Sequence, residues 1–455
     1  MQEAVKNLPR NFVKLRERFG LLSWHKMRNK LPSCVLFSMA GLACASAQVT
    51  AVRSARMLDV ERGEYVNNAV ILIEHGKITQ VGSGLAIPAG ASVIDMGGAT
   101  LMPGLIDAHT HVLSRTQAVG SLNQSYILQM MTKSNEYRVL EGAANAKAIL
   151  NSGFTAVRDL GSEGAGYADV ALRRGIDAGL VPGPRMEVAT RSIAATGGYF
   201  PIRISPEMAD MARGSQLITG SDEARRTVRE QIYNGADVIK VYADFLDVAS
   251  PNTVNFNHQT LTVDEMKTIV EEAHKGGHRV AAHAQSREGA RNAVEAGVDS
   301  IEHGTDLDHE TLALMAKRGV YLVPTSAAQF GSMETAKGAQ RDQMEQRFDA
   351  FRKELADARQ LHVKIAMGFD AADAEEQGKS AQELLMLVKL GFTPQEALRS
   401  ATTVGAELMG MQGSIGGLEA GKFADIIAVE GDPLHDVSAL LHVTLVMKGG
   451  TRANP

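Results

Sequence analysis

The chain has 455 residues, of which 44% are hydrophobic and 22% are charged, and its net charge is −5 at pH 7. This length and apolar content are enough for a large buried core, and one barrel with a smaller domain fits them. The slightly acidic balance gives no reason to expect nucleic acid as a partner, because proteins that bind it carry an excess of positive charge.

The first 47 residues have the layout of a secretory signal peptide. A basic segment leads into the apolar residues 31–43, which are too few to span a membrane comfortably, and a small-residue triplet follows at 45–47. We therefore expect cleavage after Ala47, a periplasmic or secreted mature protein, and no membrane insertion of the mature chain. A lipoprotein anchored through Cys44 is the less favoured alternative, since Gly41 stands where that signal usually has an aliphatic residue.

Met27 is a second candidate for the translation start, because basic residues follow it at once, and residues 1–26 would then be an upstream extension. Both cysteines, Cys34 and Cys44, lie in the segment that cleavage would remove. The mature chain would then have no disulfide and no thiolate ligand, even in an oxidising compartment. Any metal must accordingly be held by nitrogen and oxygen atoms.

Both ends of the mature chain are predicted to form a small β domain. Residues 48–102 read as short strands, among them 69–74 and 77–81, separated by turns that contain Gly and Pro. Residues 415–455 have the same pattern. Neither piece is expected to make a stable sheet alone, so we expect them to combine into one β-sandwich domain beside the central residues 103–414.

In residues 105–111 an apolar run ends in His109 and His111. Side chains two positions apart lie on one face of a strand, so both imidazoles can bind the same metal ion. Taken alone, the pair fits a structural role equally well. The later segments of the chain favour the metal, because several of them also end in a potential ligand.

Seven further apolar runs follow, and the segments between them have helical periodicity. The runs span residues 155–159, 185–189, 237–242, 279–283, 299–304, 320–324 and 363–370, and the helical segments include 262–275, 287–296 and about 341–361. Together with the run that carries His109 they make eight strand–helix units, the number that closes an α/β (β/α)8 TIM barrel. The active site of such a barrel lies at the carboxyl ends of its strands, where Lys240, His283, His303 and Asp370 fall.

Several motifs occur in order over about residues 50–450. They are MPGLIDAHTH (102–111), GFTAVRDLG (153–161), GADVIKVY (235–242), AAHA (281–284), IEHG (301–304), the run ending in Asp370, and GKFADIIAVEGDP (421–433). Together they resemble the amidohydrolase superfamily, in its binuclear-metal branch of Xaa-Pro-dipeptidase-like and imidazolonepropionase-like enzymes. Within this branch the chain looks similar to the periplasmic amidohydrolases of environmental bacteria that hydrolyse ochratoxin A.

The resemblance implies two divalent metal ions, and zinc suits the expected nitrogen and oxygen ligands. The more buried ion would take His109, His111 and Asp370, and the other would take His283 and His303. Lys240 would join them, because a lysine buried at the end of an apolar strand has a lowered pKa and its neutral amine can add CO2 to become a bridging carbamate. A lysine that merely pairs with an acid at the rim of the barrel is the alternative.

The implied reaction is hydrolysis of the amide bond to a C-terminal amino acid, as in a dipeptidase or carboxypeptidase, by a hydroxide that bridges the two ions. Asp370 would accept the proton of the hydroxide and deliver it to the leaving amine. Tyr242 lies two residues after Lys240 and so on the same side of the strand, where it would bind the substrate carboxylate or polarise the carbonyl. Packing at the mouth of the barrel is the alternative for Tyr242.

Two departures from the family pattern add aromatic residues near the expected site. Tyr199 stands in a segment where relatives commonly have Gly-Gly-His-Gly, and Phe369 precedes Asp370 where relatives often have Thr. We therefore expect a bulky or aromatic substrate, such as an N-acyl-phenylalanine compound like ochratoxin A. The long loop at about 192–222 is expected to form part of the pocket wall.

The candidate partners for a substrate carboxylate are Arg158, Arg191 and Arg203, because a guanidinium binds that group with two hydrogen bonds. For Arg158 an ion pair with the adjacent Asp159 at the rim is an equal alternative.

Two other functions compete with amide hydrolysis by a binuclear site. A mononuclear deaminase or cyclic-amide hydrolase of the same superfamily uses the His-x-His pair, another His and an Asp, but does not need Lys240. A non-catalytic scaffold is expected to lose ligands, whereas this chain has all six. The resemblance also implies a homo-oligomer, an octamer among the forms expected, and a small-molecule amide or dipeptide as the binding partner.

Overall fold

The computed structural model describes residues 49–116, 122–198, 214–246 and 257–453. The expected signal peptide, its cleavage position after Ala47 and both cysteines lie outside these residues, so the export expectation stays a prediction. Within the described parts of the chain, no helix combines the length and the apolar character that a membrane span requires.

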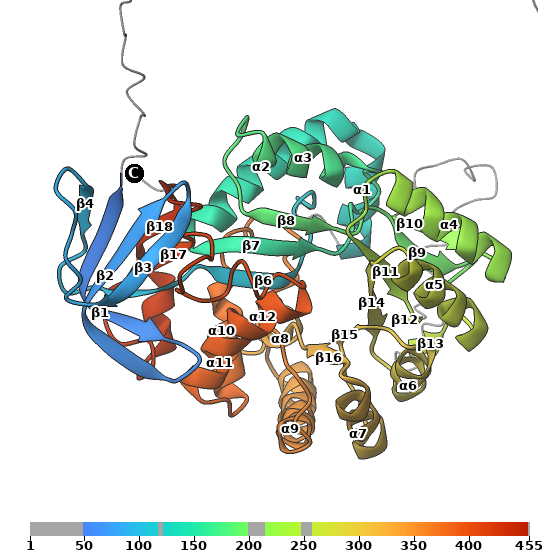
Figure 1. The fold of residues 1–455 in the computed structure, drawn as a ribbon. Helices are drawn as coiled ribbons and strands as arrows, with labels where there is room; N and C mark the ends of the chain where they lie inside the picture. The colour runs from blue at the N-terminus through green and yellow to red at the C-terminus, as the bar shows by residue number, and fades with distance from the viewer. Residues whose placement is uncertain (1–48, 117–121, 199–213, 247–256, 454–455) are drawn as a thin grey trace, which may run out of the picture. The chain divides into compact units, whose positions relative to one another are not determined.

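Both ends of the described chain enter one eight-stranded sheet (Figure 1). Its strands are β1 (Thr50–Asp59), β2 (Glu64–Glu74), β3 (Lys77–Ser83), β4 (Ser92–Asp95), β5 (Thr100–Pro103), β17 (Ile426–Val429), β18 (Val443–Lys448) and β19 (Thr451–Arg452). Antiparallel pairing of β5 with β17 joins the N-terminal strands to the C-terminal ones. The two chain ends therefore share one hydrogen-bonded sheet, and the boundaries of the expected β domain stay a prediction.

The central part of the chain supplies mainly parallel strands. One set holds β6 (Leu105–Thr110), β7 (Phe154–Asp159) and β8 (Arg185–Val188), and a second holds β9 (Ser192–Ala195), β10 (Ser215–Ile218), β11 (Val238–Tyr242), β14 (Arg279–Ala284), β15 (Ser300–His303) and β16 (Tyr321–Val323). A short antiparallel pair, β12 (Asp244–Leu246) and β13 (Asn257–Gln259), follows β11. The amide of Asp237 donates to the carbonyl of Val188, which links the two parallel sets.

The expected strand at 363–370 is irregular, although it lies between β16 and β6. The amide of Ala366 donates to the carbonyl of Leu322 on one side, and Met367 accepts from the amide of Ala108 on the other. A Cβ at Gly368 would lie 2.6 Å from the Cβ of His109, so the close approach of the two segments requires glycine here. The segment then turns at Asp370, whose φ is +62°, instead of continuing as a strand.

Helices alternate with the parallel strands and lie outside them (Figure 1). They are α1 (Leu122–Thr132), α2 (Asn135–Asn151), α3 (Ala168–Asp177), α4 (Ser221–Tyr233), α5 (Val263–Lys275), α6 (Arg287–Ala296), α7 (His309–Arg318), α8 (Ser326–Phe330), α9 (Ala339–Gln360), α10 (Ala381–Lys389), α11 (Pro394–Ser400) and α12 (Thr403–Leu408), with the 3-10 helix η3 (Val437–Leu441) near the C-terminus. Local signals explain the predicted boundaries: Thr262 and Glu265 form a capping box at the start of α5, and Gly297 ends α6 with a φ of +98°. The three predicted helical segments are thus confirmed.

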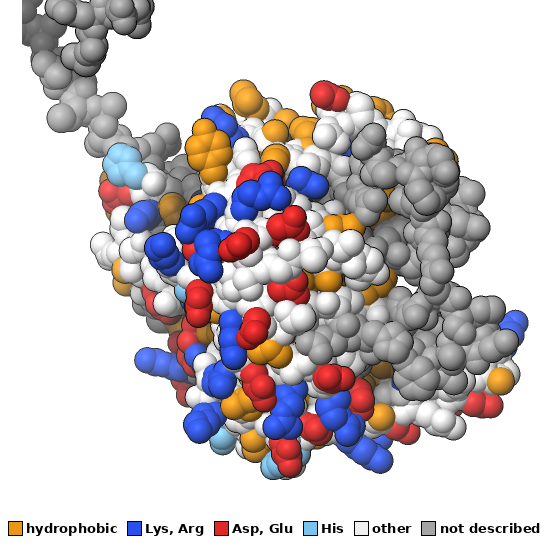
Figure 2. Space-filling model, turned by 90° about the vertical axis from the view of Figure 1, so that its right-hand side faces the viewer, with side chains coloured by type: hydrophobic (Ala, Val, Ile, Leu, Met, Phe, Trp, Pro, Cys, Tyr) orange, Lys and Arg blue, Asp and Glu red, His pale blue; other side chains and the backbone are white. Residues whose placement is uncertain are grey.

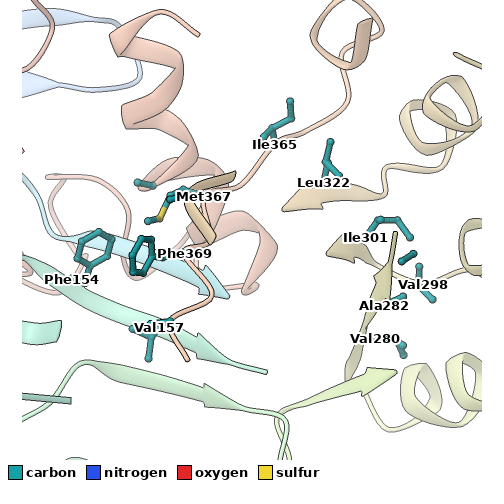
Figure 3. Close-up of a cluster of buried hydrophobic side chains, with 14 of the residues drawn as sticks. Phe154, Val157, Val280, Ala282, Val298, Ile301, Leu322, Ile365, Met367 and Phe369 are labelled. Carbon is teal, nitrogen blue, oxygen red and sulfur yellow. The ribbon is translucent and has the colours of Figure 1, made fainter. Parts of the chain in front are cut away.

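The apolar core lies between the parallel strands and the helices around them. Figure 3 shows Val280 and Ala282 of β14 on the side of the helices, near Ile301 of β15. The alternate residues Ala281 and His283 belong to the other face of β14, because successive strand side chains point to opposite faces. Strand β14 therefore buries one face against helices and directs the other, with His283, away from them.

The outer surface is charged but mixed in sign on the face that Figure 2 presents. Basic and acidic side chains stand next to one another there. Ion pairs such as Arg291 with Glu295 on α6, at 3.2 Å, are of the exposed kind that contributes little to stability.

Candidate active site

A cavity of about 470 Å³ opens at the carboxyl ends of the parallel strands. All six predicted metal ligands line it, together with Tyr242: they are His109, His111, Lys240, His283, His303 and Asp370. These side chains come from β6, β11, β14, β15 and the 363–370 segment, which are far apart in sequence. The structure thus brings together every ligand that the sequence motifs proposed.

Asp370 lies among the imidazoles. Its Oδ1 is 3.2 Å from Nε2 of His111 and 3.5 Å from Nε2 of His109. Ligand atoms of His109, His303 and Asp370 all lie within 4.8 Å of one another, which is a spacing that one metal ion can span. The rings of His283 and His303 are 4.6 Å apart, so His283 lies next to this group.

Lys240 is only 1% exposed and stands on β11 opposite Ala281 of β14, two residues before the pair of Tyr242 with His283. Burial lowers the pKa of its amine to about 8, while the nearby carboxylates of Glu302 and Asp370 act in the opposite direction. About a tenth of the amine is then neutral at pH 7, far more than for an exposed lysine. Such an amine is nucleophilic, which the chemistry expected of Lys240 requires.

The remaining donor atoms also suit a metal. Nε2 of His283 is buried and has no hydrogen-bond partner within the described residues. Burial lowers the pKa of His109 and His283 well below the ordinary histidine value and that of His303 to about 4. These three rings are therefore neutral near pH 7, which is the form of imidazole that binds metal ions.

Three polar partners that the sequence analysis did not single out orient the rings. Glu302 Oε2 lies 2.8 Å from Nδ1 of His109, and Thr325 Oγ1 lies 2.7 Å from Nδ1 of His303. Nδ1 of His111 lies 3.2 Å from the carbonyl of Gly161. Partners of this kind select the tautomer and hold the ring in place, so that its other nitrogen faces the cavity. Glu302 is part of the IEHG motif, but the motif alone does not show that its carboxylate contacts His109.

His111 differs from the other three histidines in its electrostatic surroundings. Burial alone would lower its pKa, but the carboxylates of Glu163 and Asp370 outweigh this effect and raise it to about 9. Glu163 Oε1 is 3.1 Å from Nδ1 of His111. Asp370 in turn has a pKa well below its usual range, because His109 and His111 outweigh the effect of burial. The carboxylate of Asp370 is thus ionised in this site.

Of the three arginines predicted to bind a substrate carboxylate, none lines the cavity within the described residues. Arg158 is 1% exposed; its guanidinium donates to the carbonyl of Ala108, to Ser300 and, at 2.7 Å, to Glu302. The expectation for Arg158 was therefore wrong, as was the alternative pair with Asp159. Arg191 is half-buried away from the cavity, and Arg203 lies outside the described residues.

The prediction that Phe369 forms part of the pocket was also wrong. Its ring is 4% exposed and packs in the apolar core near Phe154 and Met367 (Figure 3). The chain turns at Asp370, whose φ is +62°, so that Asp370 faces the cavity while Phe369 stays in the core. Tyr199 lies outside the described residues, and the described ends of the 192–222 loop do not line the cavity.

Other residues that line the cavity were not predicted. The aromatic ones are Tyr126 and Phe245, and the polar ones include Gln285, Gln329 and Arg347. Phe245 lies 5.5 Å from the ring of Tyr242, which lies 4.8 Å from that of His283. They stand on segments that follow the strands, and no motif marks them.

Comparison with known proteins identifies the family to which the chain belongs. The chain matches the Amidohydrolase family over residues 100–453. Ochratoxinase of Aspergillus niger is 30% identical over 430 residues, which cover 89% of this chain and 86% of that protein.

Solved structures agree with this match. The crystal structure of A. niger ochratoxinase is similar with a TM-score of 0.75 at 28% identity, and covers 89% of this chain and 96% of that one. A Xaa-Pro dipeptidase with methionine bound in its active site has a TM-score of 0.74 at 28% identity, covering 89% and 99%. The likeness extends over nearly all of the described chain.

Proposed function

Because this chain belongs to the amidohydrolase family and is a hydrolase, we propose that it cleaves the amide bond to a C-terminal amino acid. One observation carries the proposal: four histidines, a buried lysine and an aspartate from five separate segments of the chain line a single cavity. The similar proteins are an ochratoxinase and a Xaa-Pro dipeptidase, which supports an amide or dipeptide substrate over a cyclic amide.

We propose that the fold is a closed (β/α)8 barrel with a small β-sandwich domain. Backbone hydrogen bonds run from β8 to β11 through Asp237, and from β16 and β6 to the 363–370 segment. Together with the strand pairs within each sheet, they connect eight segments in succession and return to the first. Eight parallel segments with an active site at their carboxyl ends are the arrangement of such a barrel.

The proposed cofactors are two divalent ions, with zinc as the expected metal. The donor set fits them, since the three neutral imidazoles and a carboxylate suit zinc, and the buried Nε2 of His283 has no hydrogen-bond partner among the described residues. Lys240, carboxylated by CO2, would add two oxygen ligands between the sites. Two bound ions of this kind lower the pKa of a water molecule and polarise the scissile carbonyl.

Asp370 then serves as the proton carrier of the reaction. Its Oδ1 faces His109 and His111 in the cavity, and its carboxylate is ionised, so it can accept a proton from the attacking water and pass it to the leaving amine. Tyr242 lines the same cavity and is positioned to contact the substrate. The buried pair of Glu302 with His109 keeps that imidazole in one orientation throughout.

The aromatic lining favours an aromatic substrate. Tyr126, Tyr242 and Phe245 all contribute to the cavity wall, so N-acyl-phenylalanine compounds such as ochratoxin A are candidate substrates. A hydrolysis screen of N-acyl amino acids and dipeptides, including ochratoxin A, tests this with the metal-replete protein. We expect faster turnover of aromatic than of small aliphatic substrates; equal turnover of both would remove this preference from the proposal.

Metal content and Lys240→Ala test the binuclear site. We expect about two equivalents of metal per chain and a loss of activity in Lys240→Ala of at least about 100-fold. One equivalent with full activity would favour a mononuclear deaminase or cyclic-amide hydrolase instead. If wild type and Lys240→Ala are equally stable and neither hydrolyses any substrate of the screen, the result would favour a non-catalytic scaffold.

We propose export to the periplasm or the medium, with cleavage after Ala47. N-terminal sequencing of the protein from a periplasmic fraction should begin at Gln48. A mature N-terminus at Cys44 carrying lipid would support the lipoprotein alternative.

A further inference from the structure

Arg347 is a cation in the cavity wall that no motif of the chain marks. It stands on α9 and lines the same cavity as the six donor side chains. The buried residues of α9 are Phe351, Leu355 and Ala358, which recur at helical spacing on one face. Arg347 precedes Phe351 by four residues and therefore continues this inward face beyond the core, where it reaches the open cavity.

Aromatic packing holds this part of α9 in place. Phe348 and Phe351 contact Phe330 of α8, with ring centroids 5.3 Å and 5.7 Å apart. Ala328 and Gln329 of α8 line the cavity next to this contact. The backbone that carries Arg347 is thus packed against the cavity wall, while its side chain is exposed to solvent.

Arg347 lacks the acidic partner that neighbouring arginines have. Arg341 pairs with Glu345 at 2.7 Å, and Arg352 pairs with Asp349 at 3.0 Å. The residues three and four positions from Arg347 on the helix are all uncharged. Within the described part of the chain, the guanidinium of Arg347 makes no hydrogen bond or ion pair.

The acids near the mouth of the cavity are occupied by backbone groups. Asp373 accepts hydrogen bonds from the amides of Glu375 and Glu376, and Glu376 accepts from those of Ala372 and Asp373. Of the described basic residues that line the cavity, Lys240 is buried among the donor side chains. Among the described basic residues of the cavity wall, Arg347 is the exposed one, so it can meet an anionic group of a substrate.

We propose that Arg347 binds the free α-carboxylate of the substrate and so makes the enzyme selective for the C-terminal residue. A guanidinium binds a carboxylate through two parallel hydrogen bonds, a geometry that an amide or ester cannot reproduce. The inference rests on the proposed function and deepens it. Arg347 takes the place that the sequence analysis gave to Arg158 and Arg191, while Arg203 lies outside the described residues and stays a prediction.

The test compares substrates that differ only in this charge. N-acetyl-L-phenylalanylphenylalanine and its C-terminal amide are hydrolysed by wild type, Arg347→Gln, Arg347→Lys and the control Arg341→Gln, which changes a paired arginine of the same helix outside the cavity. We expect Arg347→Gln to raise the KM of the acid about 10- to 100-fold with kcat within about 3-fold, and to leave the amide unchanged. Arg347→Lys should recover part of the loss, and Arg341→Gln should equal wild type.

Binding without turnover separates this inference from the proposed function. Calorimetry measures the binding of 3-phenylpropanoate and of neutral 3-phenylpropan-1-ol to the same metal-loaded proteins. The wild type should bind the carboxylate at least about 10-fold more tightly than Arg347→Gln does, and the alcohol equally in both. This result supports Arg347 even if no substrate is hydrolysed, in which case only the proposed function fails. Equal carboxylate binding by both proteins, or none by either, overturns the role of Arg347.

Discussion

The two walls of the cavity are built differently. The strand-end wall, formed by His109, His111, Lys240, His283 and His303, is at most 9% exposed, and its side chains are held by buried partners such as Glu302 and Thr325. The helix wall, formed by Gln329 of α8 and Arg347 of α9, ends in an exposed guanidinium that pairs with no acid among the described residues.

This difference indicates two roles: the strand-end wall would position the metal ions, and the helix wall would select the substrate. Side chains that must hold ions at fixed distances need buried partners, since a small displacement of a ligand weakens the site. A side chain that meets an incoming substrate must stay unpaired until the substrate arrives. On this basis, changes in the strand-end wall should reduce the rate for every substrate, whereas changes in the helix wall should alter the choice among substrates.

Removal of metal should have the largest effect. Dialysis against a chelator is expected to abolish hydrolysis of all substrates and to lower the melting temperature by several degrees, because ions that bind only the folded state stabilise it. Activity assays and thermal unfolding before and after return of Zn2+ check this. Full activity in metal-free protein would contradict the role assigned to the strand-end wall.

Asp370→Asn should lower kcat by about 1000-fold or more, because the amide can neither carry the proton nor balance the charge of the ions. Asp373→Asn is the matched control, since Asp373 lines the same cavity but contacts backbone amides of its own loop. Its kcat should stay within about 3-fold of wild type. Comparable losses of kcat in both variants would mean that activity depends on the total negative charge of the cavity and not on Asp370 itself.

Thr325→Val should reduce metal affinity or kcat about 10- to 100-fold, because it removes the hydroxyl that orients the imidazole of His303. The side chain keeps nearly the same volume. Thr325→Ser retains the hydroxyl and should stay within about 3-fold of wild type. Metal titration and steady-state kinetics of the two variants distinguish the lost hydrogen bond from a change in packing, which would affect both.

Phe369→Leu should cost about 1–2 kcal/mol of stability and leave the ratio of aromatic to aliphatic turnover unchanged, because the ring packs in the core. Denaturant unfolding and the substrate screen measure the two effects. A shift of more than about 10-fold in the ratio, with stability unchanged, would instead indicate that Phe369 contacts the substrate.

The smallest expected effect concerns Glu354 of α9. Burial raises the pKa of its carboxyl from 4.5 to about 9, so the folded protein holds a proton that the unfolded chain releases near pH 4.5. The stability contributed by this group is complete below that pH and is lost as pH rises toward 9. Glu354→Gln should therefore gain a few degrees in melting temperature relative to wild type at pH 8 and little at pH 4. A gap of equal size at both pH values would contradict the raised pKa.

Local patterns were sufficient for the predicted helices and for two of the candidate ligands, Lys240 and His283. Residues 287–296 carry their own start and stop signals at Ser286 and Gly297, so α6 agrees with its prediction. Lys240 and His283 end uniform apolar runs, and strand alternation alone directs them to the inner face.

The same alternation fails where the backbone leaves the extended region. His303 would share the face of Ile301 in a regular strand, but its φ is +68° and its imidazole lines the cavity. Asp370 likewise has a φ of +62°. A non-glycine residue with positive φ costs energy and occurs only where surrounding contacts impose this conformation. No local sequence pattern therefore predicts it.

The amino-acid sequence alone predicted the family, through its motifs, and six candidate ligands that line one cavity. It predicted most of the parallel strands through short-range periodicity. The partners of those side chains depended on the folded chain: Arg158 joins Glu302 across 144 positions, Phe369 turns to the core, and Arg347 reaches the cavity. These contacts join residues whose distance along the chain carries no information about their distance in space, so they emerge only when the strands and helices pack together.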